Sequence, residues 1–553
     1  MIGLNKIGLN QVQLNRLRLN APFPTCRKMA GGGGSGDGFP VLPGDVTRWH
    51  FGGLTNEMMA AMDDPRIEDA DGKGRFLSFK NFAWGGMSGV GGYGDENHLT
   101  FYKFTFDDYV FIAIKAGVKH MNFTFRVTGL QPGNKLTLAF FGTTNTVYGT
   151  WDKDGIYTVN SAVVEVGKPV YFYNGYGATR GEFTIEILPL YPGALVFDGV
   201  DDYGVCDNFP ILTKEKGYTV VALRQWISMG EGLYGLVSNT KNWFNDGAFI
   251  VEYNSNNATN KFVNRPVSFG KVNIEMDLPN NFTYQTSKSY KGVPITTGSF
   301  KGTNSLFVGK LSNIIGNCSN VAIWELVFLD HDAIEEELTK IKDYFVKTYP
   351  WLFPDQAWTV TGKTNEDEDR ATIANITGNG NDLVLSNFGF AEGSGYNEEG
   401  EYAGYLVTDG VDDKIVSSSF GMGKDFTVVG EWKFMNNIID NAGIVKGLSL
   451  FVYNANNGLR IYINNSNKGS ILNTKTLKAI CSDGRVYSDD WSEMIINEEQ
   501  PITSSKSNLR IGINIKGNNF AKIALKNLAI YNQILSKDDC IKAYNYLQTL
   551  KAK

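Results

Sequence analysis

Aspartate residues cluster at two places in the sequence, within two copies of the pentapeptide Asp-Gly-Val-Asp-Asp at residues 198–202 and 409–413. Ca²⁺ prefers hard carboxylate oxygens, so each copy is a candidate calcium site. Alternatively, the carboxylates cap a tight turn by accepting nearby backbone N–H groups. Three ligands from one turn would still need others from distant loops, so the turn interpretation is favoured. The candidate ligands are Asp198, Asp201, Asp202, Asp409, Asp412 and Asp413.

Residues that would indicate catalysis are sparse. A glycosidase needs two carboxyl groups about 5–9 Å apart around its sugar. No predicted strand carries alternating acidic residues, and we interpret the acidic run 366–369 as a solvated loop. The segment 89–94 has GxGxxG spacing but no surrounding βαβ unit. We therefore predict no enzymatic activity and no catalytic residues. The histidines, none with a partner at metal-ligand spacing, are His50, His98, His120 and His331.

Aromatic residues on exposed loops are the usual platforms for binding a sugar without catalysis. Five of them follow predicted strands in Gly- and Asn-rich stretches, where each is a candidate platform. Packing in the core or within the loop is the favoured alternative for each. These candidates are Trp84, Tyr93, Trp243, Phe390 and Tyr396.

The composition favours short strands joined by turns. Glycine contributes 62 of 553 residues, and Asn-Gly and Asp-Gly pairs, which are turn signals, recur along the chain. The net charge of −6 and the lack of a basic run argue against nucleic-acid binding. No apolar run is long enough to span a membrane. The five cysteines are odd in number and far apart, so we expect buried, reduced thiols.

Most of the sequence is an internal repeat. Trp49 opens Trp-His-Phe-Gly-Gly-Leu-Thr-Asn, and Trp358 opens Trp-Thr-Val-Thr-Gly-Lys-Thr-Asn. In both copies an alternating strand ending in Asn-Phe follows, and then the pentapeptide. The tryptophan lies 149 residues before the pentapeptide in the first copy (198 − 49) and 51 in the second (409 − 358). We interpret the extra residues, 99–191, as an inserted β-sandwich, because they contain several alternating runs separated by turn residues.

Each copy ends with a late strand and an amphipathic helix. Capping boxes predict that the first helix begins at Asp332, with Glu335 three residues on, and the second at Ser536, with Asp539 three residues on. The turn from Phe197 to Tyr203 and the ending Leu-Ala-Ile-Tyr-Asn-Gln-Ile-Leu resemble the laminin-G-like, concanavalin-A-like lectin/glucanase superfamily. This resemblance implies jelly-rolls of two antiparallel sheets.

The chain is thus predicted to be all-β, with tandem jelly-roll sandwiches, an inserted smaller sandwich and short closing helices. Its predicted parts are an N-terminal repeat anchor (1–30), a Gly-rich linker (31–38), the start of module 1 (39–98), the insert (99–191), the remainder of module 1 (192–350) and module 2 (351–553).

Residues 2–21 repeat every five positions, with two apolar residues two apart followed by Asn. In an extended chain those two side chains share a face, which twenty residues cannot bury alone. The segment is interpreted as one coil of a β-helix, as a tail docked on its own protein, or as an anchor that intertwines with other chains. The anchor is favoured, with a homo-oligomer expected and a trimer preferred. Its repeated leucines are Leu4, Leu9, Leu14 and Leu19.

The combination of these repeat elements resembles laminin-G-like modules in virion appendage proteins of crAss-like phages of Bacteroidales. The resemblance implies a head- or tail-fibre-type protein made in the host cytoplasm and located in the virion. Residues 1–30 would contact other virion proteins, and the modules would face host surface glycans, with no nucleic acid or membrane as partner. The alternative is a bacterial cell-surface glycan-binding protein or polysaccharide-degrading enzyme, which the unpaired cysteines and the lack of a visible signal peptide disfavour. A third possibility is a spacer without a ligand.

Overall fold

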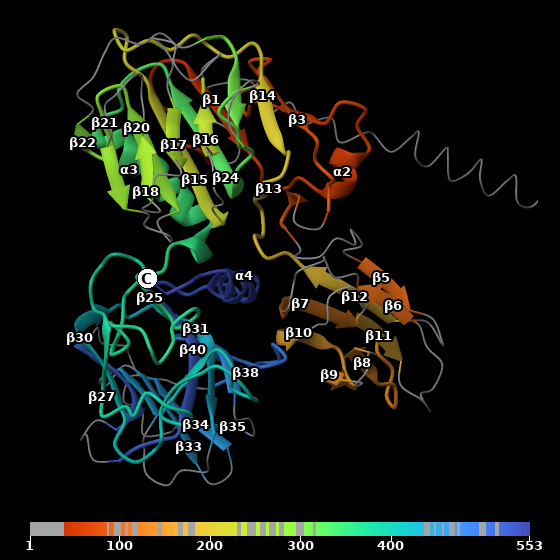
Figure 1. The fold of residues 1–553 in the computed structure, drawn as a ribbon, viewed down its shortest axis with the longest axis vertical. Helices are drawn as coiled ribbons and strands as arrows, with labels where there is room; N and C mark the ends of the chain where they lie inside the picture. The colour runs from red at the N-terminus through yellow and green to blue at the C-terminus, as the bar shows by residue number, and fades with distance from the viewer. Residues whose placement is uncertain are drawn as a thin grey trace, which may run out of the picture.

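The computed structural model consists mainly of antiparallel sheets, which confirms the predicted all-β class (Figure 1). Residues 1–37, and with them the predicted anchor, lie outside the described residues. The structure describes residues 38–552 except for 86–87, 93–100, 105–108, 113–119, 141–145, 164–169, 175–182, 229–233, 240–249, 255–260, 265–271, 276–280, 295–302, 313–316, 436–442, 447–449, 456–457, 464–469, 473–475, 497–504 and 515–518.

Module 1 is a sandwich of two eight-stranded sheets whose strands come from both sides of the insert. The first sheet has the order β22-β21-β20-β15-β24-β13-β4, with β1 also paired to β24. Its strands are β1 (Val46–His50), β4 (Gly89–Val90), β13 (Leu195–Asp198), β15 (Thr219–Ser228), β20 (Phe282–Thr286), β21 (Ser289–Tyr290), β22 (Val293–Pro294) and β24 (Asn320–Leu329). The second sheet has the order β19-β18-β17-β16-β23-β14-β3-β2. Its strands are β2 (Arg66–Glu68), β3 (Phe76–Lys80), β14 (Tyr203–Cys206), β16 (Tyr234–Ser238), β17 (Ile250–Asn254), β18 (Lys261–Asn264), β19 (Val272–Glu275) and β23 (Leu306–Val308).

Module 2 repeats this topology strand for strand. Its sheets run β28-β29-β40-β31-β36-β37-β38, with β25 paired to β40, and β26-β27-β30-β39-β32-β33-β34-β35. The first comprises β25 (Gln356–Thr359), β28 (Gly395–Asn397), β29 (Tyr405–Val407), β31 (Thr427–Phe434), β36 (Thr476–Cys481), β37 (Arg485–Ser488), β38 (Glu493–Ile495) and β40 (Ile523–Tyr531). The second comprises β26 (Thr372–Ile373), β27 (Leu383–Ser386), β30 (Lys414–Met422), β32 (Gly443–Lys446), β33 (Leu450–Ala455), β34 (Gly458–Ile463), β35 (Ser470–Leu472) and β39 (Ser505–Ile513).

The insert forms two sheets of its own, β10-β7-β12-β5 and β6-β11-β8-β9. No pairing joins them to the sheets of either module within the described strands. The strands are β5 (Phe101–Phe104), β6 (Tyr109–Ile112), β7 (His120–Thr128), β8 (Leu136–Phe140), β9 (Thr146–Trp151), β10 (Gly155–Val163), β11 (Val170–Asn174) and β12 (Phe183–Leu188).

The central strand of each module is buried on both faces, which explains its nearly continuous apolar sequence. In β24, Val321 and Ile323 face the core between the two sheets of module 1. Ala322 and Trp324 face the opposite way, into a second core that lies outside the sandwich. The outer face of this sheet is therefore a packing surface and not a solvent face.

The described helices are few and short. The closing helix α3 (Glu335–Thr348) begins after Ile334 and not at the predicted cap Asp332. Asp332 instead accepts the backbone N–H of Ser287 at 2.8 Å, while Glu337 accepts the N–H of Ile334 at 2.9 Å. The remaining helices are α2 (Asn56–Ala60), the 3-10 turn η1 (Pro350–Leu352) and α4 (Lys537–Gln548).

The second closing helix, α4, begins as predicted. Ser536 accepts the N–H of Asp539 at 3.1 Å and donates to its carboxylate at 2.7 Å. No helix in the described residues has the length and apolar character needed to cross a membrane. The described cysteines, Cys206, Cys318, Cys481 and Cys540, are buried and unpaired, and Cys26 lies outside the described residues.

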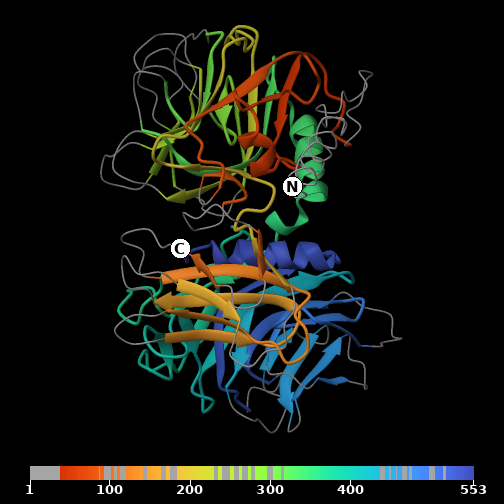
Figure 2. The ribbon, with the colours of Figure 1, turned by 90° about the vertical axis from the view of Figure 1, so that its right-hand side faces the viewer.

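Helix α4 lies where module 1, module 2 and the insert meet (Figures 1 and 2). One apolar core joins all three, with Trp324 from module 1, Ile156 from the insert and Leu547 from α4. Polar contacts reinforce it. Asn281 of module 1 donates to the Tyr546 hydroxyl at 2.9 Å, and Thr124 of the insert donates to Asn545 at 2.9 Å. The insert thus lies within module 1 along the sequence, but it packs on module 2 in the structure.

This shared core predicts a large effect of one truncation in α4. Leu547 is fully buried there, so Leu547→Ala is expected to lower the free energy of unfolding by about 2–5 kcal/mol, as measured by urea denaturation. Val384→Ala is the matched control, because Val384 is 51% exposed, and it should change stability by less than about 0.5 kcal/mol. Equal effects of the two substitutions would contradict the shared core.

Candidate functional site

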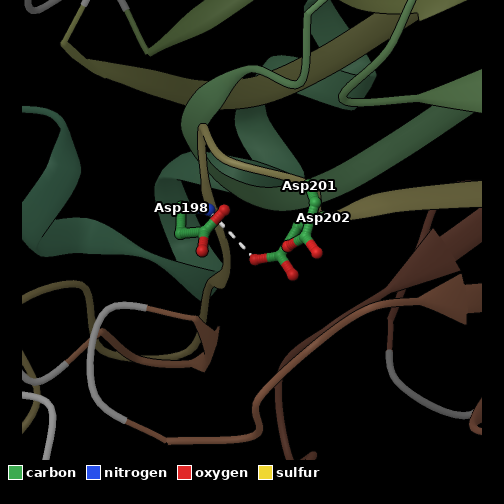
Figure 3. Close-up of side chains that lie close together, drawn as sticks. All are labelled: Asp198, Asp201 and Asp202. Carbon is green, nitrogen blue, oxygen red and sulfur yellow. Dashed lines mark hydrogen bonds between the residues drawn. The ribbon is translucent and has the colours of Figure 1, made fainter.

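The pentapeptide of module 1 forms the turn that carries the chain from β13 in one sheet to β14 in the other (Figure 3). The carboxylate of Asp202 accepts the N–H of Asp198 at 3.0 Å, and the carboxylate of Asp198 accepts the N–H of Val200 at 2.7 Å. Gly199 has φ +83° and packs against Asn320, where a Cβ would come within 2.8 Å of the Asn320 side chain. The motif therefore specifies a tight turn with its own side-chain caps.

The Asn-Phe element of the repeat meets this turn. Asn81 donates its side-chain amide to the carbonyl of Asp201 at 3.0 Å. Its φ of 67° is in the left-handed region, which Asn tolerates better than most residues. Ser88, from the next turn, donates its hydroxyl to Asp202 at 2.7 Å. The Asn-Phe element is thus joined to the turn through a backbone carbonyl, and the turn of Ser88 is joined to it through the buried side chain of Asp202.

Module 2 repeats the same bonds. Asp413 accepts the N–H of Asp409 at 2.7 Å and the hydroxyl of Ser394 at 3.1 Å. Asp409 accepts the N–H of Val411 at 2.7 Å, and Asn387, with φ 70°, donates to the carbonyl of Asp412 at 3.1 Å. The duplicated sequence therefore encodes a duplicated hydrogen-bond pattern.

The asparagine that ends the tryptophan element completes each pattern. Asn56 exchanges two hydrogen bonds with the backbone of Val90, at 2.8 and 3.2 Å. Asn365 makes the same exchange with Tyr396, at 2.8 Å for both bonds. Gly89 must be glycine, since at its φ of +114° a Cβ would lie 2.5 Å from the Asn56 side chain. We call this set of bonds the signature cluster. It comprises Asn56, Asn81, Ser88, Asp198 and Asp202 in module 1, and Asn365, Asn387, Ser394, Asp409 and Asp413 in module 2.

The aspartates of each turn also lie close enough to be considered as metal ligands. In module 1, three carboxylate oxygens lie within 4.8 Å of one another, one from each of Asp198, Asp201 and Asp202. In module 2, the same holds for Asp409, Asp412 and Asp413. Calcium takes six to eight oxygen ligands. In module 1 the hydrogen bonds of the turn already use Oδ1 of Asp198 and Oδ2 of Asp202. The three carboxylates of each turn therefore fit the capping of that turn better than the binding of calcium.

Asp202 is the most perturbed residue of the cluster. It is fully buried, and its Oδ1 has no hydrogen-bond partner within the described part of the chain. Burial raises the pKa of Asp202 to about 7, against the lowering effect of the Ser88 hydroxyl. Burial likewise raises the pKa of Asp413 to about 6. Such perturbed carboxyl groups occur at active sites, but also in structural networks like this one.

The predicted aromatic platforms differ in where they lie. Trp84 and Phe390 occupy equivalent positions, three residues after the Asn of Asn-Phe, with φ 49° and 48°. Both are half-buried; Trp84 stacks on Phe82 at a centroid distance of 4.8 Å. Tyr396 is only 3% exposed and its hydroxyl donates to the carbonyl of Arg370, so it is a core residue. Tyr93 and Trp243 lie outside the described residues.

A pocket that sequence reasoning missed lies between the insert and module 2. Its volume is about 190 Å³. The residues lining it come from distant parts of the chain, so no local motif could have indicated it. They include Trp151, Tyr157 and Thr158 of the insert and Glu431, Lys433 and Lys478 of module 2.

The carboxylate of this pocket belongs to a buried network. Glu431 accepts the hydroxyl of Tyr544 at 2.8 Å and that of Tyr405. Burial alone would raise the pKa of Glu431, but the charges of Lys478 and Lys526 and the two tyrosine donors lower it to about 2. A catalytic acid needs a pKa near the working pH. Glu431 is therefore an ionised hydrogen-bond acceptor and a poor candidate for a general acid.

No family model and no curated protein matches this chain. Among solved structures, a Trypanosoma rangeli sialidase is 11% identical, with 73% of this chain and 65% of that chain covered and a TM-score of 0.24. The binding domain of botulinum neurotoxin DC in complex with SialylT is 9% identical, with 60% and 84% covered and a TM-score of 0.23. The chain thus spans about two thirds of the sialidase. Such low TM-scores support no conclusion about this chain.

The buried carboxyl of Asp202 predicts a pH-dependent stability. Because its pKa is about 7 in the folded state and near 3.8 ordinarily, the folded state holds more protons between pH 4 and 7. Stability from this group is therefore greatest below about pH 4 and is lost as the pH rises towards 7. The side chain of the Asp202→Asn variant stays neutral at every pH. The free energy of unfolding of this variant, compared with that of the unmodified protein, should therefore increase as the pH rises from 4 to 7, by at most about 1.4 kcal/mol per pH unit.

The measurement is urea denaturation of both proteins at several pH values. Asp201→Asn is the matched control, since Asp201 is exposed on the same turn, and it should change stability by less than about 0.5 kcal/mol throughout. A stability difference for Asp202→Asn that stays constant with pH would refute the buried-carboxyl explanation.

Proposed function

We propose that this chain is a non-enzymatic structural protein of a phage virion, a head- or tail-fibre-type appendage. Residues 1–30 attach it to other virion proteins as a homo-oligomer, with a trimer favoured. The described domains face outward and bind host glycans or neighbouring proteins. The proposal requires no cofactor, nucleic acid or membrane.

The observation that carries this proposal is that two topologically matched sandwiches and the insert pack around α4 as one body. Such packing suits a protein that must hold binding surfaces at fixed relative positions. The duplicated aspartates, the most conspicuous chemical groups, are engaged in the turns. The virion location itself rests on the resemblance of the repeat elements to phage appendage modules.

The proposed anchor makes a prediction about oligomeric state. The full chain should sediment as an oligomer in analytical ultracentrifugation, because the repeated leucines of an extended segment share an apolar face that twenty residues cannot bury alone. Replacing Leu4, Leu9, Leu14 and Leu19 together by Ser should yield monomers. The matched control replaces Asn5, Asn10, Asn15 and Asn20 by Ser, which leaves the apolar positions intact and should preserve the oligomer. A full chain that is already monomeric would overturn self-association through this segment.

The competing function, a bacterial polysaccharide-degrading or cell-surface glycan-binding protein, has its own test. The full chain is incubated with purified surface polysaccharides, and new reducing ends are measured. We expect none to form. Turnover of any polysaccharide would refute the non-enzymatic proposal.

A further inference from the structure

The pocket between the insert and module 2 has one aromatic wall. Trp151 ends β9 and Tyr157 lies in β10, with ring centroids 5.3 Å apart. Phe125 packs edge-on behind Trp151 at 4.9 Å and fixes the orientation of its ring. The hydroxyl of Tyr157 donates to the carbonyl of Lys153 at 2.7 Å. These contacts hold two aromatic rings in place at the pocket.

The module 2 side of the pocket combines charged side chains with the apolar Trp432 and Leu477. Glu431 and Lys478 are buried, and the ammonium of Lys478 lies 4.0 Å from the Tyr544 ring centroid. Lys433 is half-buried and Asp489 is exposed at the rim. Two cationic and two anionic side chains thus line the pocket, and their formal charges cancel.

Contacts between the two domains maintain the shape of the pocket. Lys153 of the insert forms an ion pair with Asp490 of module 2. The N–H of Ile156 donates to the carbonyl of Asp490 at 3.2 Å. Both contacts lie beside residues that line the pocket. The insert is therefore held in the position where its aromatic side chains face the charged side chains of module 2.

The size and chemistry of the pocket restrict its ligand. A cavity of about 150 Å³ holds benzene, so a pocket of about 190 Å³ accommodates one six-membered ring. A purely apolar ring would leave the charged wall without new partners. A charged ligand would gain little from a wall whose charges cancel. A ring with C–H faces and hydroxyl edges satisfies both walls.

We propose that this pocket binds one neutral pyranose unit of a glycan, with its C–H face on Trp151 and Tyr157 and its hydroxyls towards Glu431, Lys433 and Lys478. The inference takes its ligand class from the proposed function but does not depend on a virion location. The insert would then have a role, because it supplies the aromatic residues Trp151 and Tyr157 that complete the site of module 2.

Saturation-transfer-difference NMR tests the proposal on the full chain. The probes are D-glucose, D-galactose, D-mannose and N-acetyl-D-glucosamine at millimolar concentration, with N-acetylneuraminic acid as the charged comparison. At least one neutral sugar should receive saturation, and Trp151→Ala should weaken its binding about tenfold or more. Lys433→Met removes an ammonium that the proposal places against the sugar hydroxyls but keeps an unbranched side chain, so it should weaken binding as well and covers the case in which Trp151→Ala fails to fold.

Phe76→Ala is the matched control, because Phe76 is an exposed aromatic residue of module 1 that does not line the pocket, and it should leave binding unchanged. Trp84→Ala is the rival comparison, because Trp84 is itself a candidate sugar platform. No saturation of any neutral sugar, or equal binding by Trp151→Ala and the unmodified chain, would overturn the proposal. Loss of binding in Trp84→Ala alone would also overturn it, while glycan binding by the protein as a whole would stand. Failure of the site and failure of the proposed function are thereby distinguished.

Discussion

A buried carboxyl group must either accept hydrogen bonds or become protonated, and this constraint governs both modules. Asp202 and Asp413 each draw in a backbone N–H from their own turn and a serine hydroxyl from another turn. The turn in question switches the chain between the two sheets of the sandwich. Each carboxylate therefore fixes the point where the sheets are joined, which accounts for the same residues at the same places in both copies.

The second organising feature is the core outside the sandwiches. Helix α4 and the turn η1 fill the space between the outer faces of two sheets and the edge of the insert. The central strands are apolar on both faces for this reason. The arrangement turns three domains into a single body and creates a pocket that belongs to none of them alone.

The sequence predicted the fold well where the signals were local. Alternating runs, the duplicated tryptophan, Asn-Phe and pentapeptide elements, and the cap at Ser536 all correspond to observed structure. The prediction of Asp332 as a helix cap was wrong, because a distant backbone N–H at Ser287 takes its carboxylate. Local spacing could not reveal this competition.

The partners of the candidate site were harder to predict. Ser88 and Ser394 lie in Gly-rich loops with few distinguishing neighbours, so their bonds to the aspartates were not foreseen. The pocket was missed for a related reason. Its aromatic residue Trp151 and its carboxylate Glu431 are 280 positions apart (431 − 151) and meet only through docking of the insert on module 2.

We propose that the signature aspartates hold turns and do not bind an ion. Calcium titration of the chelator-treated full chain by isothermal calorimetry tests this most directly, because Ca²⁺ binding by the clustered carboxylates would give heat until the sites are full. Our explanation predicts no saturable heat up to millimolar Ca²⁺. Saturable binding that disappears when Asp198 and Asp409 are both changed to Asn would contradict it.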